Sequence, residues 1–304
     1  MTAIVTGAAG FLGRALTRAL LDGGEQVVGI DRLPLAPVPG LTVLTADLTA
    51  GDPMVRAALQ SGDKVFHLAG RPGVRDRTAG IARLRHRDNV LAAAAVLDAV
   101  PPHVPLVVTS SSSVYGGTTD GRPSHESDPL RPRGGYARSK VRMEGLCARR
   151  LAEGGAVTIV RPFTVAGEGQ RPDMAFSLWL EAARAGRPLR LLGSPDRTRD
   201  ITDVRDAVRA LIALAEVRAR GVVNLGTGTG HSLRRMAEAV AAALGTPVSY
   251  VVEPAGADEV TDSLADVRRL VELTGFAPRT DLFDVVARQA RSMGAVPDAS
   301  GVLS

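Results

Sequence analysis

The chain has 304 residues, of which 45% are hydrophobic and 23% are charged, an ordinary composition for one large globular domain or two smaller ones. The formal net charge of +5 comes with basic residues that are nearly all arginine, and both signs are interspersed, which is compatible with an anionic small substrate. Aromatic residues make up only 3% of the chain, so a nucleic-acid partner, which needs clustered basic residues interleaved with aromatic ones, is excluded.

The titratable and terminal residues narrow the class of protein further. A single cysteine, Cys147, excludes an internal disulfide and indicates a reducing compartment and a packing role. The five histidines show no zinc-ligand spacing, so we expect no metal. The chain enters a strand pattern directly from Met1, and no later apolar stretch is long enough to span a membrane. We therefore expect a soluble, cytoplasmic protein with no membrane partner.

The first 31 residues follow the order strand, glycine-rich turn, helix, strand. Residues 2–6 and 26–30 read as strands, and a helix pattern between them runs to Leu21, which makes a βαβ unit. The turn, GAAGFLG at 7–13, has its glycines at GxxGxxG spacing. This spacing lets backbone N–H groups at a helix N-terminus approach a pyrophosphate closely.

Asp31 ends the second strand, where its carboxylate can accept hydrogen bonds from an adenosine ribose. A free 2′-hydroxyl suits this carboxylate and a 2′-phosphate would be repelled, so the sequence favours NAD over NADP. Arg32 beside it counts against this preference. A glycine fingerprint is a weak signal by itself, but this one follows the right strand and is followed by the right acid.

Further elements follow in the order expected of a parallel sheet. Strands are predicted at 41–45, 64–68, 106–109, 157–161 and 222–225, and helices at 89–100 and 233–244. Ligands bind at the strand-end loops of such a sheet, so we expect Asp47 and Leu48 near the adenine and loop 69–75 near the ligand. Alternatively, Asp47 only caps the next helix.

Tyr136 and Lys140 stand four residues apart in the string Tyr136-Ala137-Arg138-Ser139-Lys140. Positions i and i+4 share one face of a helix, so the phenol and the ammonium can address the same space. A nearby cation lowers the pKa of a tyrosine and makes it a usable general base. The simpler alternative is a tyrosine on a helix surface beside a solvated lysine. Because arginine replaces lysine almost everywhere else, a retained Lys140 favours the chemical interpretation, and the other lysine, Lys64, is expected on the surface.

Several motifs together resemble one known family. GAAGFLG, Asp31, HLAG at 67–70, SSSVYG at 111–116 and YxxxK are similar to the extended short-chain dehydrogenase/reductases, the NAD-dependent sugar epimerase/dehydratase family. The resemblance covers nearly the whole chain. It implies an α/β fold, a Rossmann-type doubly wound parallel sheet that holds NAD, with a smaller C-terminal substrate-binding domain closing over it.

The resemblance also implies roles for individual residues. Ser111 is the expected catalytic hydroxyl, Tyr136 the base, and Lys140 the residue that orients the nicotinamide ribose while lowering the tyrosine pKa. The expected cofactor-binding residues are Gly7, Gly10, Phe11, Leu12, Gly13, Asp31, Arg32, Asp47, Leu48, Leu68, Ala69, Gly70, Asn89, Tyr136, Lys140 and Pro162.

The string Gln170-Arg171-Pro172-Asp173-Met174-Ala175 resembles the UDP-glucuronate 4-epimerases. In that family the positions of Thr164 and Arg171 are expected to hold the sugar carboxylate, which a planar guanidinium fits through two hydrogen bonds. The alternative is a surface arginine. Arg199 resembles the pyrophosphate-contacting arginine of nucleotide-sugar enzymes, whereas a further arginine that many relatives carry is missing near Gly256. The expected substrate-binding residues are Arg75, Ser112, Ser113, Thr164, Arg171, Arg199 and Glu259.

The expected reaction is the 4-epimerisation of UDP-glucuronate to UDP-galacturonate through a transient 4-keto sugar, without net redox change. Related dehydratases usually carry an acid pair directly after the catalytic hydroxyl, and decarboxylases a glutamate, where this chain has Ser112 and Ser113. A UDP-glucose 4-epimerase and another NAD-linked oxidoreductase stay open. A non-catalytic NAD-binding protein fits least well, because a pure binder has no use for an aligned base.

The domain division follows from the same resemblance. We place the NAD-binding domain at 1–163 and about 200–228, and the substrate-binding domain at 164–199 and about 229–304. Helices over 89–100 and 138–151 could pair across a twofold axis, so a homodimer is expected, although ordinary buried helices also have alanine-rich faces.

Overall fold

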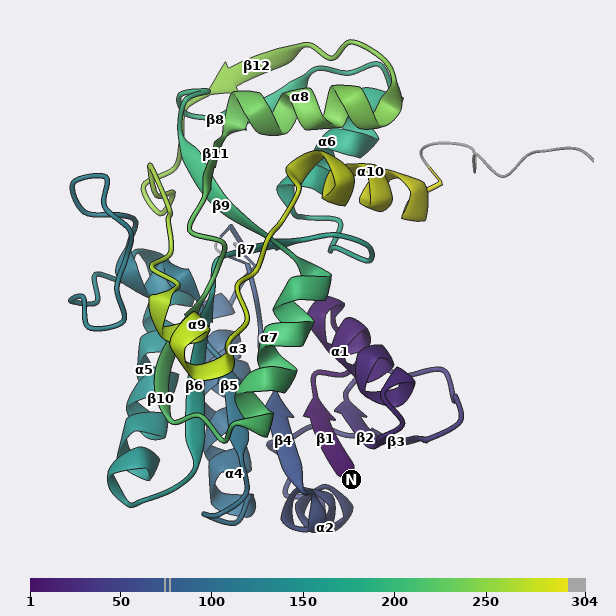
Figure 1. Ribbon diagram of the computed structural model, residues 1–304, viewed down its shortest axis with the longest axis vertical. Coiled ribbons are helices and arrows are strands. Elements are labelled where there is room, and N and C mark those ends of the chain that lie inside the picture. The colour runs from purple at the N-terminus through teal and green to yellow at the C-terminus, as the bar shows by residue number, and fades with distance from the viewer. Residues whose placement is uncertain (74, 77, 295–304) are drawn as a thin grey trace, which may run out of the picture.

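The computed structural model describes residues 1–73, 75–76 and 78–294, so the expected end of the second domain lies outside the described residues. Its centre is a seven-stranded sheet in the order β10-β6-β5-β4-β1-β2-β3, in which each neighbouring pair is parallel (Figure 1). The strands are β1 (Thr2–Thr6), β2 (Gln26–Asp31), β3 (Leu41–Thr45), β4 (Lys64–His67), β5 (Leu106–Thr109), β6 (Val157–Pro162) and β10 (Gly221–Leu225). Each predicted strand is confirmed to within a residue at its ends.

Helices cover both faces of the sheet. Helices α1 (Phe11–Asp22), α7 (Val204–Glu216) and α9 (Arg268–Thr274) pack on one face, and α2 (Pro53–Ser61), α4 (Ala92–Ala99) and α5 (Gly134–Ala152) pack on the other. Because both faces are buried, the strands read as apolar runs rather than as alternating ones. The doubly wound, Rossmann-type fold is therefore confirmed.

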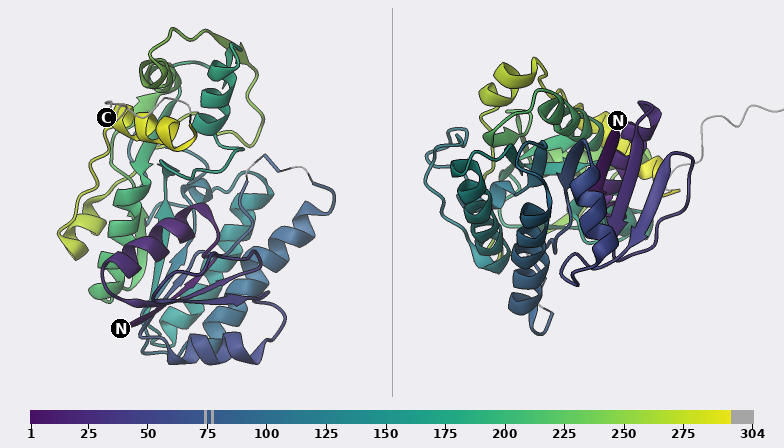
Figure 2. Two further views of the ribbon diagram at one scale, coloured as in Figure 1. Left: turned by 90° about the vertical axis from the view of Figure 1, so that its right-hand side faces the viewer. Right: turned by 90° about the horizontal axis from the view of Figure 1, so that it is seen from below.

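A second layer lies over the carboxyl ends of the strands, as Figure 1 and the left-hand view of Figure 2 show. The chain leaves the sheet after β6, returns for α7 and β10, and leaves again. The layer contains β7 (Thr164–Ala166), α6 (Ala175–Arg184), β8 (Leu189–Leu192), β9 (Thr198–Asp203), β11 (Gly230–Ser232), α8 (Leu233–Leu244), β12 (Tyr250–Glu253) and α10 (Leu282–Ser292). It has a hydrophobic core of its own, to which Phe176, Trp179 and Leu180 of α6 contribute.

The helix expected over 89–100 is not uniform. After the short helix α3 (Ile81–Arg85), residues His86–Leu91 form a π-helix, η1, and only then does α4 begin. A π-helical turn adds one residue to the hydrogen-bonded repeat and is frequent at functional sites. Hydrophobic periodicity carries no signal for such a turn.

Two side chains of the sheet and its flanking helices, one in β4 and one in α5, test the predictions about burial. The prediction that Lys64 lies on the surface was wrong: its side chain is 7% exposed, and Nζ lies 2.7 Å from a carboxylate oxygen of Glu25. Cys147 is buried in the core, as expected, and burial raises the pKa of its thiol to about 12. Within the part of the chain that the structure describes, no helix is long and apolar enough to cross a membrane.

Candidate active site

A cleft of about 1290 Å³ lies between the sheet and the second layer. The predicted residues that line it are Gly7, Gly10, Phe11, Leu12, Gly13, Asp31, Arg32, Asp47, Leu48, Leu68, Ala69, Gly70, Arg75, Ser111, Ser112, Ser113, Tyr136, Lys140, Pro162, Thr164, Arg171, Arg199 and Glu259. They come from helices, strand ends and loops far apart in sequence that meet at the carboxyl edge of the sheet. The structure thus brings the predicted cofactor and substrate residues together.

The glycine-rich turn packs too closely to admit side chains at two positions. Gly7 has a positive φ of 74°, and a Cβ there would lie 2.6 Å from the backbone nitrogen of Ala69. A Cβ on Gly13 would lie 2.0 Å from the carbonyl oxygen of Gly7. Helix α1 then begins at Phe11 without a side chain capping its N–H groups. An uncapped helix N-terminus with a close backbone fits a pyrophosphate.

Asp31, at the end of β2, lies beside this turn at the cleft wall. One carboxylate oxygen accepts a hydrogen bond from the backbone N–H of Ala9 and the other from that of Leu33, each at 3.0 Å. These bonds fix the carboxylate at the cleft wall. A carboxylate held there suits the two hydroxyls of an adenosine ribose, so the residues present fit NAD.

Arg32, the next residue, turns toward other carboxylates. Its two terminal nitrogens donate to the two oxygens of Asp88, at 3.1 and 3.2 Å, and Nη1 lies 3.7 Å from Asp47. Asp47 also accepts from the backbone N–H and the hydroxyl of Thr49, and these bonds, led by the backbone one, lower the pKa of its carboxyl. Arg32 and Asp47 therefore belong to one charged cluster beside Asp31, where the adenosine of NAD is expected.

Asn89 is the predicted cofactor residue that does not line the cleft. Its side chain is fully buried in η1, where Oδ1 accepts from the N–H of Arg71 at 2.6 Å and Nδ2 donates to Oγ of Ser139 at 2.8 Å. A Cβ on Gly70 would lie 2.7 Å from Asn89 Oδ1. Asn89 thus holds the loop after β4 against α5 from behind the cleft wall.

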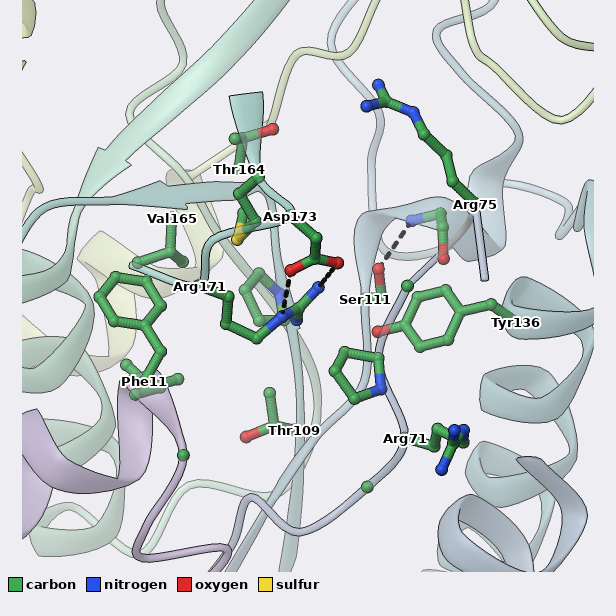
Figure 3. Close-up of a pocket in the computed structure, with 18 of the residues that line it drawn as sticks. Phe11, Arg71, Arg75, Thr109, Ser111, Tyr136, Thr164, Val165, Arg171 and Asp173 are labelled. Carbon is green, nitrogen blue, oxygen red and sulfur yellow. Dashed lines mark hydrogen bonds and ion pairs between the residues drawn. The ribbon is translucent and has the colours of Figure 1, made fainter. Parts of the chain in front are cut away.

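The phenol of Tyr136 faces the cleft beside Ser111 (Figure 3). Burial raises the pKa of Tyr136, while the hydrogen bond with Ser111 and the charges of Arg171 and Arg85 act in the opposite direction. Ser111 itself caps the 3₁₀-helix η2 (Ser112–Tyr115), and its Oγ accepts from the N–H of Ser113 at 3.2 Å. The phenol of Tyr136 and the hydroxyl of Ser111 can therefore both form hydrogen bonds with the same substrate oxygen.

Lys140 lies on the same face of α5, one turn after Tyr136, as predicted. Its Nζ donates to the carbonyl oxygen of Thr109 at 2.8 Å. Burial lowers the pKa of Lys140 to about 8, against the opposing charge of Glu144. The expected lowering of the Tyr136 pKa by Lys140 is not observed, because burial of the phenol outweighs the cations around it and Lys140 is engaged by the backbone.

A buried ion pair supports the serine loop from behind. The guanidinium of Arg161 donates to both oxygens of Glu144, at 3.0 and 2.7 Å, and Ser110 donates to the same carboxylate at 2.5 Å. Arg161 also donates to the phenol oxygen of Tyr115 at 2.8 Å. The network ties α5 and β6 to the residue that precedes Ser111.

Arg171 reaches into the cleft from the loop before α6, opposite Tyr136 (Figure 3). Its Nε and Nη2 donate to the two carboxylate oxygens of Asp173 at 2.9 and 2.8 Å. Thr164, in β7, lines the same part of the cleft. Asp173 stands in the same string as Arg171, but no role was predicted for it.

The three remaining predicted substrate residues form a chain of charges at the cleft mouth. Arg75 Nε lies 2.6 Å from one oxygen of Glu259, and Arg199 Nη2 lies 3.7 Å from the other. Arg199 also donates to the carbonyl oxygens of Thr261 and Val260, at 2.8 and 2.9 Å. In this arrangement Arg199 binds the 258–262 loop that covers the cleft.

Several other lining residues had no predicted role. Asp88 lies in the π-helix, Arg133 directly precedes α5, and Asp258 lies in the 258–262 loop. Further residues come from the second layer, where no short motif marks them, and these include Leu178, Trp179, Glu181, Arg187, Arg190 and Met236. Asp173 did have a usable signal, because it stands in the same string as Arg171.

Comparisons with known proteins agree with this geometry. Residues 3–226 match the model of the NAD dependent epimerase/dehydratase family. The uncharacterized UDP-glucose epimerase YtcB of Bacillus subtilis (strain 168) is 31% identical, with 93% of this chain and 95% of that protein aligned. A probable UDP-glucuronate 4-epimerase of Rhizobium meliloti (strain 1021) is 30% identical, with 95% of both aligned.

A solved structure is similar along the whole chain. The protein described as MoeE5 in complex with UDP-glucuronic acid and NAD is 36% identical, superposes with a TM-score of 0.88, and is matched over 97% of this chain and 99% of its own. The likeness therefore includes both the sheet and the second layer.

Proposed function

Because the chain belongs to the NAD-dependent epimerase/dehydratase family, we propose that it catalyses the 4-epimerisation of UDP-glucuronate to UDP-galacturonate. Its cofactor is NAD. The observation that carries the proposal is Arg171, whose guanidinium lies in the cleft opposite Tyr136, where it can bind a carboxylate at C6 of a sugar whose C4 hydroxyl meets the phenol (Figure 3). A neutral C6 hydroxyl would not need this cation.

The residues around Tyr136 supply the proton transfers. Tyr136, once deprotonated, accepts the proton of the C4 hydroxyl, and Ser111 donates a hydrogen bond to the oxygen as it becomes a ketone. NAD held in the cleft would supply the redox chemistry, as acceptor and later donor of a hydride. Tyr136 then gives the proton back, so no net oxidation occurs. Lys140, on the same helix face, would hold the nicotinamide ribose.

The inverted product requires the 4-keto sugar to turn over before the hydride returns to its other face. This rotation would take place in the cleft between the sheet and the second layer. A 4-keto uronate is also a β-keto acid, and it loses CO₂ when the bond to its carboxylate aligns with the carbonyl π system. We propose that Thr164, Arg171, Ser112 and Ser113 hold the carboxylate out of that alignment.

Proton NMR of the products tests the proposal directly. The purified protein is incubated with UDP-glucuronate and no added reductant, and a parallel sample contains UDP-glucose. Formation of UDP-galacturonate is expected in the first sample. Interconversion of UDP-glucose and UDP-galactose alone would support the second candidate, a UDP-glucose 4-epimerase, which the name of the Bacillus subtilis relative favours. If neither product forms, both candidate functions are overturned.

Two finer points stay predictions. Homodimerisation through α4 and α5 is expected from the family resemblance. The division into a nucleotide-binding part and a substrate-binding part is proposed along the boundaries given above, with Arg171 and Thr164 contributed by the second part. Sedimentation of the purified protein measures the first, and limited proteolysis with and without nucleotide measures the second.

A further inference from the structure

The carboxyl end of strand β2 and the residue after it bring two side chains with opposite preferences to the part of the cleft where the ribose of the cofactor is expected. Asp31 and Arg32 are adjacent, and both line the cleft. A carboxylate at this position suits the ribose hydroxyls of NAD, whereas a guanidinium suits the 2′-phosphate of NADP through a two-nitrogen contact. The selectivity of the site therefore depends on where the guanidinium of Arg32 points.

In the structure the contact surface of Arg32 that fits a phosphate is occupied. Its two terminal nitrogens donate in parallel to the two oxygens of Asp88, and Asp47 lies 3.7 Å away on the same side. The Arg32 side chain is 46% exposed, so it has space to turn toward the ribose. What opposes that turn is the loss of the ion pair with Asp88.

Asp88 is fixed in place by its own surroundings. Its side chain is 4% exposed and lies in the π-helix η1, one residue before the buried Asn89. Arg87 Nε lies 2.8 Å from one of its oxygens, and Arg71 Nη1 lies 3.8 Å from the other. The carboxylate therefore cannot follow Arg32 toward the ribose, and Arg32 must leave it to reach a 2′-phosphate.

We propose that Asp88 is a cofactor-specificity residue, which disfavours NADP by holding the guanidinium of Arg32 away from the ribose 2′ position. The proposal concerns the nucleotide and is independent of which sugar the protein uses. It assigns to a buried carboxylate, 56 residues after Arg32, a share of the selectivity that Asp31 provides directly.

Nucleotide displacement tests the proposal without reference to turnover. The site of the full-length protein is first filled with fluorescent NADH, which is then displaced with NAD or with NADP to give a Kd for each. Asp88→Asn keeps the shape of the side chain but removes its charge. A charged hydrogen bond newly made to the phosphate should lower the ratio of the NADP Kd to the NAD Kd by about tenfold or more. An unchanged ratio would overturn the proposal.

The double variant Asp88→Asn with Arg32→Ala tests whether Arg32 is the residue that contacts the 2′-phosphate. In the double variant the gain in NADP binding should disappear. If the gain persists, removal of the Asp88 charge is responsible rather than Arg32, and the proposal is overturned. Asp98→Asn is a matched control, because it removes an exposed partner of Arg56, 2.8 Å away and not part of the cleft. This variant should leave the ratio unchanged.

The Asp88→Asn variant is expected to fold, because the three arginines around the carboxylate keep 46%, 29% and 42% of their side chains exposed and can be hydrated. If it does not fold, Arg32→Ala alone still decides. A restrained Arg32 makes no contact with a 2′-phosphate, so the ratio of the two Kd values should change less than about twofold. A tenfold weaker binding of NADP in Arg32→Ala would overturn the proposal.

Discussion

The guanidinium of Arg171 and the carboxylate of Asp173 face each other through two parallel hydrogen bonds, at 2.9 and 2.8 Å, inside the cleft. The carboxylate side chain is 63% exposed and the guanidinium 33%. On the proposed function, Asp173 occupies the position on Arg171 that the carboxylate of UDP-glucuronate would take, and it can move from there into solvent. Binding of that substrate would then exchange one carboxylate for another.

Removal of Arg171 should separate the two candidate substrates. We expect Arg171→Ala to lower kcat/KM for UDP-glucuronate by about ten- to a hundredfold, because a charged hydrogen bond is lost, and to change that for UDP-glucose little. The measurement is initial rates on both sugars by NMR. A rise in decarboxylated pentose would support the role of Arg171 in orienting the carboxylate. Arg18→Ala, which removes an exposed pair with Asp22 on α1, is the control. Equal losses on both sugars would contradict the proposed contact.

Asp173→Asn should have the opposite effect. Neutralising the competing carboxylate frees Arg171, and an exposed pair of this kind contributes little to the fold, so KM for UDP-glucuronate should fall by about two- to fivefold. Saturation curves for UDP-glucuronate measure the change. A higher KM would mean that Asp173 holds Arg171 in its binding orientation.

The base is tested by Tyr136→Phe, which removes the hydroxyl and keeps the ring. Turnover should fall by about a hundred- to ten-thousandfold, the usual contribution of a general base, while displacement of NADH by NAD is retained. Because burial raises the pKa of Tyr136, the phenol is protonated at neutral pH, and the wild-type rate should rise as the pH is raised above neutrality. A rate that falls across that range would contradict a phenolate base.

His67 should make the fold sensitive to mild acid. It is 1% exposed and shares a 2.8 Å hydrogen bond with Thr6, and burial, followed by the charge of Lys140, lowers its pKa from 6.5 to about 3. As the pH falls, His67 is protonated near pH 6.5 in the unfolded chain but only near pH 3 in the folded one. The stability that neutral His67 contributes is therefore present above pH 6.5 and is lost as the pH falls toward 3. Between pH 7 and pH 5 the wild type should lose about 2 kcal/mol more than His67→Gln does.

Urea unfolding at both pH values gives that difference. The carboxyl groups titrate alike in the two proteins and cancel. Identical losses of unfolding free energy in the wild type and the variant would contradict the prediction that His67 is protonated in the unfolded chain but not in the folded one.

The pair of Glu144 and Arg161 should be asymmetric in its response to mutation. Glu144→Gln leaves a buried guanidinium without its counter-charge and should cost about 3–5 kcal/mol of unfolding free energy. Replacing both residues with methionine removes both charges, and we expect a loss smaller than that of the single variant. The free energy of unfolding is measured by chemical unfolding of the wild type, the single variant and the double variant. A double variant less stable than the single one would contradict this account.

The parts of the site that could be predicted from the sequence are those in which one short string of residues determines the relative positions of the side chains. Gly7, Gly10 and Gly13 are confined to one turn, and Tyr136 and Lys140 to one helix face, so their spacing alone places them. Asp88 gave no such signal, because its partners Arg32 and Arg71 come from other strand ends and its helix is π-helical. Lys64 was misplaced for the same reason, since its partner Glu25 lies 39 residues earlier.

The strand order also has a consequence for synthesis on the ribosome. Strand β6 pairs with β5 on one side, and its other side is covered only by β10, which begins at Gly221, after the chain has built β7, α6, β8, β9 and α7. At about 5–20 residues per second the intervening segment takes several seconds to emerge. For that interval the nascent chain carries an open, apolar strand edge, the kind of surface at which chains pair wrongly. Slow translation between β6 and β10 should therefore reduce the yield of folded protein, even though no residue changes.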